Sequence, residues 1–252
     1  IRMLGYEIRA EQNGGYPSGY RMMAASLGLL GCIENGENIT RGEVAVLISK
    51  ALEADLMEQT VFGTDGGISV VEGDNLLKNY HNIIKSKGIV NSSGYTALTK
   101  NHNSLSKKYI EIGGEKYITD IPDTDRFLGM NVEFWYNTAE DKPYKTVAIL
   151  PAALNDEKII SSEDDPYFKN NTLYYYKNDK LQSGIKISSD IDFIYNGAAY
   201  LSDYNLADFM PESGEIRLID NDGDGKYNVI IITNEKTYAV KWVSETERKI
   251  YV

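Results

Sequence analysis

Apolar residues recur at steps of three and four between positions 14 and 52, and this spacing predicts two helices joined by a loop. The first helix is expected to begin at Pro17 and Ser18 and to loosen at the glycines at positions 28 and 31. Each helix should turn one apolar stripe toward a core. The stripe residues are Tyr20, Met23, Ala24 and Leu27 in the first helix, and Val44, Leu47, Ile48, Ala51 and Leu52 in the second.

The start of the second helix has a defined local signal. Thr40 stands where an N-cap is expected, and Glu43 follows three residues later. A threonine and a glutamate at this spacing can each bond the other's backbone amide, which is the capping box. Gly42 weakens this helix start, because glycine inside a helix costs about 1 kcal/mol relative to alanine.

The same residues resemble a known family. The segment Ile39-Thr40-Arg41-Gly42-Glu43 is similar to the ITRAE signature of the S-layer homology (SLH) domain. The upstream GGYPSGY and AASLGLL segments resemble variant repeats of clostridial surface proteins. The resemblance covers the first fifth of the chain, and one partial repeat is visible.

The resemblance implies a small three-helix unit that usually works as a set of three repeats. Such units anchor proteins noncovalently to the secondary cell-wall polysaccharide of Gram-positive bacteria. It also implies that Arg41 lines the groove where the wall glycan binds. The alternative for Arg41 is an arginine at a helix start that pairs with a neighbouring acid.

The N-terminal residues are expected to be the tail of a helix. The segment from Ile1 to Tyr6 ends at Gly5, a residue suited to a helix C-cap. We therefore expect the chain to be a fragment or processed form of a longer precursor.

From Ile68 onward the hydrophobic period changes to about two and turn signals come at short intervals, which predicts an antiparallel β region. Residues 109–112 and 115–118 form the clearest hairpin, because Gly113 and Gly114 supply the positive φ angles of a tight turn. The other expected strands cover residues 87–90, 131–137, 145–150, 172–176, 184–188, 192–196, 215–219, 229–233, 238–243 and 249–252.

The expected fold class is α+β, with a small N-terminal helical SLH-type module followed by predominantly antiparallel β domains, each a small barrel or sandwich. The predicted domains are 1–58 (helical module), 59–152 (first β domain) and 153–252 (second β domain). Residues 161–171 are interpreted as a loop, and residues 201–209 as one or two helical turns. The two β domains could be an internal duplication.

Composition excludes several classes of protein. The net charge of −11 would repel a polyanion, so we expect no nucleic-acid partner. Cys32 is the single cysteine, which excludes an internal disulfide and a cysteine-rich zinc site. No apolar run reaches the length of a membrane helix, so no membrane span is expected. The abundant tyrosines suit half-buried strands or surfaces that face a glycan.

One loop has the chemistry of a metal site. Oxygen donors occupy loop positions one, three, five and nine, glycine occupies six, and position seven offers a backbone carbonyl. Position twelve is Ile231 and the flanks are strands, so the pattern fits the calcium hairpins of integrin-like β repeats better than an EF-hand. The alternative is an acidic turn held by Asx hydrogen bonds. The predicted ligands are Asp220, Asp222, Asp224, Lys226 and Asn228, with calcium as a structural ion.

Other polar residues carry weaker signals. His81 and His102 have no nearby partner of a metal or hydrolase motif and are interpreted as surface residues. The serines at 92, 93, 161 and 162 lack the context of a nucleophile. The run from Glu163 to Asp165 is interpreted as a solvated loop.

These patterns together predict a non-enzymatic, extracellular protein of the Gram-positive cell surface or S-layer. It would be anchored through its helical module to secondary wall polysaccharide and stiffened by calcium in its β region. Self-association in a surface lattice or filament is a further expectation. The competing hypotheses are a wall- or polysaccharide-active enzyme whose catalytic part is absent or hidden in the β region, and a carbohydrate-binding module that uses the tyrosines and Trp135.

Overall fold

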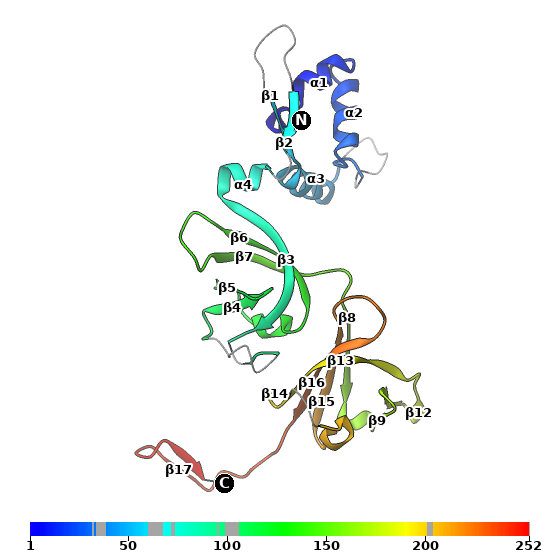
Figure 1. The fold of residues 1–252 in the computed structure, drawn as a ribbon, viewed down its shortest axis with the longest axis vertical. Coiled ribbons are helices and arrows are strands. Elements are labelled where there is room, and N and C mark those ends of the chain that lie inside the picture. Colours follow the sequence, from blue (N-terminus) through cyan, green and yellow to red (C-terminus); the bar gives the residue numbers. More distant parts are fainter. Residues whose placement is uncertain are drawn as a thin grey trace. The chain divides into compact units, whose positions relative to one another are not determined.

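The chain forms two compact units in the computed structural model (Figure 1). The first unit comprises residues 1–84 and 137–140, and the second comprises residues 85–136 and 141–252. The structure describes residues 1–31, 33, 39–59, 68–71, 74–94, 96–98, 106–200 and 204–251, with backbone only at 59 and 68–71. The three predicted folding domains, 1–58, 59–152 and 153–252, stay a prediction.

The first unit is mainly helical, as the sequence predicts. Its small core contains residues from the N-terminal turn and from the segments between and after the helices, including Leu4, Tyr6, Leu29, Met57 and Leu76. Met23, Ala24 and Leu27 pack partly buried against that core, as expected of the first apolar stripe. Its elements are η1 (Arg2–Leu4), α1 (Glu7–Gln12), α2 (Ser18–Ser26), α3 (Arg41–Glu53), β1 (Leu56–Gln59), β2 (Ile68–Val71) and α4 (Leu76–His81).

The predicted capping box is confirmed at the start of α3. The amide of Glu43 donates to Thr40 Oγ1 at 3.2 Å, and the amide of Thr40 donates to Glu43 Oε2 at 2.7 Å. The expected burial of the α3 stripe is wrong for most of the helix. Ala51 and Leu52 pack against the core, whereas Val44 and Ile48 are exposed.

Several predictions for the first unit need correction. The predicted helical module, residues 1–58, also contains residues of strand β1, which pairs antiparallel with β2. The helix α4 was not expected, although Asn75 caps it by accepting from the amide of Lys78 at 2.9 Å. Gly5 does adopt the predicted left-handed C-cap, but the turn that it ends is the short 3-10 helix η1.

Five strands of the second unit close into a barrel in the order β3-β4-β5-β7-β6. The hairpin of β4 and β5 is confirmed, with φ of 60° at Gly113 and 82° at Gly114. Strands β5 and β7, the third and fifth of these strands along the chain, run parallel, and Ile118 of β5 lies opposite Lys145 of β7. The strands are β3 (Ile83–Ser92), β4 (Tyr109–Ile112), β5 (Glu115–Ile118), β6 (Asn131–Asn137) and β7 (Lys145–Pro151).

The barrel core follows the alternation expected of β6. Val132 and Phe134 are buried, whereas Glu133 and Trp135 are partly exposed. Glu133 pairs with the ammonium groups of Lys85 at 3.1 Å and Lys87 at 2.8 Å. The first β domain was predicted to be a small barrel or sandwich, and the structure shows a barrel.

The remaining strands of the second unit form a mixed seven-stranded sheet in the order β8-β15-β16-β13-β10-β9, with β14 paired to β13. Its core contains Leu173, Phe193, Leu218 and Ile230. The strands are β8 (Asp156–Ser161), β9 (Tyr167–Lys169), β10 (Thr172–Tyr174), β13 (Ile185–Tyr195), β14 (Ala198–Tyr200), β15 (Gly214–Asp220) and β16 (Tyr227–Asn234).

Two predictions for this sheet are wrong. Strand β9 lies in the segment 161–171 that was interpreted as a loop. The two strands predicted at 184–188 and 192–196 are the single long strand β13, interrupted by an irregularity between Ile187 and Asp192. Pairing in this sheet is predominantly antiparallel, as predicted, and the parallel pair is β13 with β16.

Barrel and sheet share one hydrophobic core, since Ile194, Ile219 and Val229 of the sheet cluster with the buried residues of the barrel. Gly129 permits the close approach: it has a φ of 80°, and a Cβ placed there would lie 2.8 Å from a Val229 methyl. The amide of Asn131 donates to Asn155 Oδ1 at 2.9 Å across the same junction.

Short elements complete the described chain. The predicted turn at Asn178 and Asp179 is confirmed, with φ of 53° and 58°. Residues 242–244 and 249–251 pair where two longer strands were expected. These elements are η2 (Thr124–Phe127), η3 (Ser162–Asp164), β11 (Tyr176–Lys177), β12 (Lys180–Leu181), η4 (Leu206–Phe209), β17 (Trp242–Ser244) and β18 (Lys249–Tyr251).

Candidate metal centre and an apolar groove

The acidic loop joins β15 to β16, two neighbouring antiparallel strands of the mixed sheet. Asp220 is the last residue of β15 and is 2% exposed, whereas Asp222 and Asp224 stand on the exposed part of the loop. The chain can turn this tightly because Gly223 and Gly225 have φ of 75° and 81°, where glycine carries no steric cost. The loop is therefore held at one end by the sheet.

Three of the predicted ligands converge. Asp220, Asp222 and Asp224 each offer one carboxylate oxygen, and these oxygens all lie within 4.8 Å of one another. Two like charges about 4 Å apart repel by about 1 kcal/mol in water and by about 4 kcal/mol near a protein surface. A bound cation would remove this repulsion, and carboxylate oxygens are the ligands that calcium prefers.

Asp220 also organises the loop backbone. Its Oδ1 accepts from the amides of Asp222 at 3.2 Å and Gly223 at 2.7 Å, and its Oδ2 accepts from the amide of Gly225 at 2.8 Å. Burial favours the protonated form of this carboxyl, but the hydrogen bonds outweigh burial and lower its pKa below the ordinary value. Asp220 is therefore held as an anion.

Asx-type hydrogen bonds continue along the loop. Asp222 Oδ1 accepts from the amide of Asp224 at 3.1 Å, and Asp224 Oδ1 accepts from the amide of Lys226 at 2.7 Å. The ammonium of Lys226 lies 3.5 Å from Asp224 Oδ2. Lys226 thus places a counter-charge beside the cluster, and a cation would compete with it.

Asn228 is engaged at the base of the loop. Its side-chain amide donates to Asn221 Oδ1 at 2.8 Å, and its Oδ1 accepts from the amide of Asn221 at 3.2 Å. Ligation by Asn228 would require this pair to open. The aspartates form the centre of the candidate site, and Asn228 supports their loop.

The sequence did not indicate two groups that position this loop. The buried side chain of Asn221 donates to the carbonyl of Gly129 at 2.8 Å, which ties the loop to the barrel. The hydroxyl of Tyr227 donates to the carboxylate of Asp156 on β8. Burial, followed by the bond to Asp156, raises the pKa of Tyr227 above its ordinary value. Both contacts join residues far apart in sequence, so no local pattern could reveal them.

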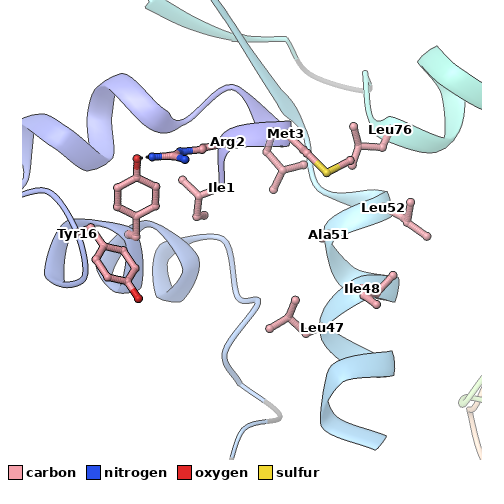
Figure 2. A pocket seen from close by; sticks show the side chains of 11 residues that line it. Ile1, Arg2, Met3, Tyr16, Leu47, Ile48, Ala51, Leu52 and Leu76 are labelled. Atoms are coloured by element: carbon pink, nitrogen blue, oxygen red, sulfur yellow. Dashed lines mark hydrogen bonds between the residues drawn. The ribbon is translucent and has the colours of Figure 1, made fainter. Parts of the chain in front are cut away.

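The helical unit contains an apolar groove of about 560 Å³. Figure 2 shows Leu47, Ile48, Ala51 and Leu52 of α3 on one side of it and Ile1 and Tyr16 on the other. Met3 and Leu76 lie near Leu52 at one end. Arg2, whose guanidinium lies 2.9 Å from Glu7 Oε1, contributes the charged group at the groove wall.

Arg41 is exposed in the first turn of α3, and within the described part of the chain it does not line this groove. His81 ends α4, and His102 lies outside the described residues. Two of the serines that lack a nucleophile's sequence context accept hydrogen bonds from backbone amides. The hydroxyl of Ser161 accepts from the amide of Glu163 at 3.2 Å, and the hydroxyl of Ser162 accepts from the amide of Gly214 at 3.1 Å.

Trp135, the tryptophan of the carbohydrate-binding hypothesis, lies on the barrel strand β6. The ammonium of Lys85 sits over its indole ring, 4.9 Å from the centroid. This contact is a cation–π interaction on a partly exposed strand face.

Comparisons of the chain with protein-family models, with curated proteins and with solved structures found no match. Among the described residues, none of the helices has the length and apolar character needed to cross a bilayer.

Proposed function

We propose that this chain is a non-enzymatic structural protein of a Gram-positive cell surface. Its helical unit attaches it to secondary cell-wall polysaccharide, and its β region is a stalk or lattice contact. The observation that carries the proposal is the capping box of Thr40 and Glu43, which makes the SLH-like segment the start of a helix. Arg41 is presented to solvent in that same turn.

Arg41 has the chemistry that a wall polysaccharide requires. Its planar guanidinium can form paired hydrogen bonds with the carboxylates or phosphates of an acidic glycan. The chain is acidic overall, so local positive groups would have to supply the attraction to such a polymer. An arginine at a helix start is free of the rotamer constraints of a core, and it can adapt to a polymer.

Calorimetric titration of the chain with purified secondary wall polysaccharide tests this role. Arg41→Ala should weaken binding at least tenfold. Arg21→Ala is the matched control, because Arg21 is an exposed arginine of the same unit on α2 and should leave binding unchanged. Equal binding by both variants and the unchanged chain would contradict the role given to Arg41.

We also propose that calcium binds the loop of Asp220, Asp222 and Asp224 as a structural ion. The convergence of three carboxylate oxygens supports this, as does the position of the loop at the junction of sheet and barrel. The ion would join the exposed aspartates to the buried one and would perform no chemistry. Sites of this kind bind calcium with a Kd of about 0.1 to 1 mM, a range suited to extracellular fluids.

A further inference from the structure

The mixed sheet carries a polar pocket of about 300 Å³, which shares no lining residue with the acidic loop or with the groove of the helical unit. Three segments of the second unit meet there: the turn between β9 and β10, the interrupted part of β13, and the start of η4. Its lining includes the partly buried aromatic residues Phe168 and Tyr204 and the exposed polar residues Asn170, Asn171 and Ser189. The pocket therefore combines aromatic rings with neutral polar groups.

The pocket lies where β13 leaves its regular pairing. Between Ile187 and Asp192 this strand bulges, because residues 188–191 stand opposite a single residue of β16. Bulges re-aim side chains and are common beside active sites. Ser188 and Ser189 belong to this bulge and line the pocket. The departure from the regular sheet therefore presents two hydroxyl groups at the pocket.

The turn between β9 and β10 is fixed by its own backbone. Asn170 and Asn171 have φ of 50° and 52°, the left-handed conformation that both central residues take in a two-residue hairpin turn. The carbonyl of Asn171 accepts from the amide of Ile187 at 2.9 Å, which ties this turn to the bulged strand. The two asparagine side chains are thus carried by a backbone that is held in place.

Within the described part of the chain, several polar groups of this pocket make no hydrogen bond to another residue. They are the side-chain amides of Asn170 and Asn171 and the hydroxyls of Ser189 and Tyr204. The ring of Tyr204 packs against Phe193 of the sheet core, with 4.9 Å between the centroids, so the position of its hydroxyl is fixed. A partly buried hydroxyl needs a hydrogen-bond partner, which here has to come from water or from a ligand.

The chemistry of these groups selects the ligand. Amides and hydroxyls both donate and accept hydrogen bonds, and so do the hydroxyls of a sugar. The charges around the pocket have both signs, because Lys169 lines it and the carboxylates of Asp192 and Asp190 act on Tyr204. An anion or a cation would therefore meet repulsion as well as attraction. The ring of Phe168 adds apolar area that suits the C–H groups of a sugar ring.

We propose that this pocket binds a neutral saccharide unit. Asn171 and Ser189 bond its hydroxyls from the turn and from the bulge, and Tyr204 bonds it from the segment before η4. A volume of about 300 Å³ lies at the lower end of ligand pockets, so it suits a single sugar ring better than a long oligosaccharide. The inference goes beyond the proposed wall attachment, because it gives the β region a ligand of its own and does not involve Arg41.

Titration of the isotope-labelled full chain with sugars, followed by heteronuclear NMR, tests the proposal. The probes are the methyl glycosides of glucose, galactose, mannose and N-acetylglucosamine, with methyl glucuronide and glucosamine as charged counterparts. At least one neutral probe should bind with a Kd of about 1 mM, as ligands of this size commonly do, and should shift the amides of the β9–β10 turn and the bulge. No saturable shift with any neutral probe, or equal or tighter binding of the charged counterparts, would overturn the proposal.

Substitutions of asparagine in two similar turns locate the site. Asn171→Gly removes one amide group, and glycine suits the left-handed turn, so the fold should persist. This variant should bind the sugar about threefold to tenfold more weakly, the usual effect of one lost hydrogen bond. Asn178→Gly is the matched control, because Asn178 has a φ of 53° in the β11–β12 turn and does not line the pocket. Equal binding by the two variants would contradict the assigned site.

A second pair of variants tests the tyrosine hydroxyl. Tyr204→Phe should weaken binding to a similar extent, whereas Tyr200→Phe should not, since Tyr200 also packs against Phe193 but does not line the pocket. Equal losses in both would indicate an effect on the core and overturn the role of the hydroxyl. Binding to wall polysaccharide is measured on the same chains: a chain that binds the polysaccharide through Arg41 but binds none of the neutral glycosides refutes this inference and leaves the proposed function standing.

Discussion

Gly19 and Gly42 are both helical glycines, but their surroundings differ. A Cβ at Gly19 would lie 2.0 Å from the carbonyl oxygen of Ala10, so α2 can pack against α1 only without a side chain there. A Cβ at Gly42 would meet nothing closer than Thr40 Oγ1, at 4.0 Å. Gly19 is therefore required by packing, whereas Gly42 is not.

These surroundings predict opposite effects of the same substitution. Gly42→Ala should raise the free energy of unfolding of the helical unit by about 0.5 to 1 kcal/mol, because alanine loses less conformational freedom in a helix. Gly19→Ala should lower it, since backbone must move to admit the methyl group. Denaturant unfolding of the two variants measures both effects. A destabilising Gly42→Ala would contradict the open space described at α3.

The contribution of Asp220 to stability should depend on pH. Its pKa is lowered in the folded state, so the stability that it contributes is present above its unfolded pKa and is lost as pH falls through the folded pKa. Asp220→Asn should cost about 1 to 3 kcal/mol at neutral pH with EDTA present, because one buried oxygen that accepts from two backbone amides is replaced.

The cost of Asp220→Asn should shrink as the solution is acidified, since the unchanged carboxyl is then protonated as well. Urea unfolding at several pH values measures this convergence. A cost that stays constant down to low pH would show that the Asp220 charge does not contribute to folding.

At the scale of elements, the sequence predicted those features that a few neighbouring residues determine. The capping box needs only Thr40 and Glu43, and the barrel hairpin needs only Gly113 and Gly114, so both could be identified in the sequence. Strand β1 and helix α4 could not, because each is short and depends on tertiary contacts. The long strand β13 was predicted as two separate strands, and the gap between them coincides with the irregularity after Ile187.

For the candidate metal loop, too, one part could be predicted from the sequence and another part could not. The spacing of Asp220, Asp222 and Asp224 predicted that their carboxylates would meet, and they do. The pairing of Asn228 with Asn221, and the bond from Asn221 to Gly129, depend on how the sheet meets the barrel. No spacing along the chain encodes that junction.

The loop yields a prediction for the whole β15–β16 hairpin. Calcium at a hundred times its Kd should add about 2.7 kcal/mol of stability. Thermal unfolding in millimolar calcium should therefore occur several degrees above unfolding in EDTA. Asp224→Asn should abolish most of that shift, and Asp179→Asn, an exposed control in the β11–β12 turn, should retain it. Identical unfolding curves for the unchanged chain in calcium and in EDTA would contradict the proposed calcium site.

At the scale of the whole molecule, the chain comprises a helical unit and a β unit whose barrel and sheet share one core. The order of strands in the barrel is shared by proteins of many functions, so it does not indicate one by itself. The parallel pairs β5–β7 and β13–β16 join distant segments, which is why hydrophobic periodicity indicated strands but not their topology.

We propose that the chain attaches noncovalently to the secondary polysaccharide of a Gram-positive cell wall. Co-sedimentation of the full chain with purified wall sacculi tests it most directly, with intact sacculi compared to sacculi stripped of that polysaccharide. We expect saturable binding to intact sacculi and loss of binding to the stripped ones. Binding that is absent from intact sacculi, or equal on both, would contradict it.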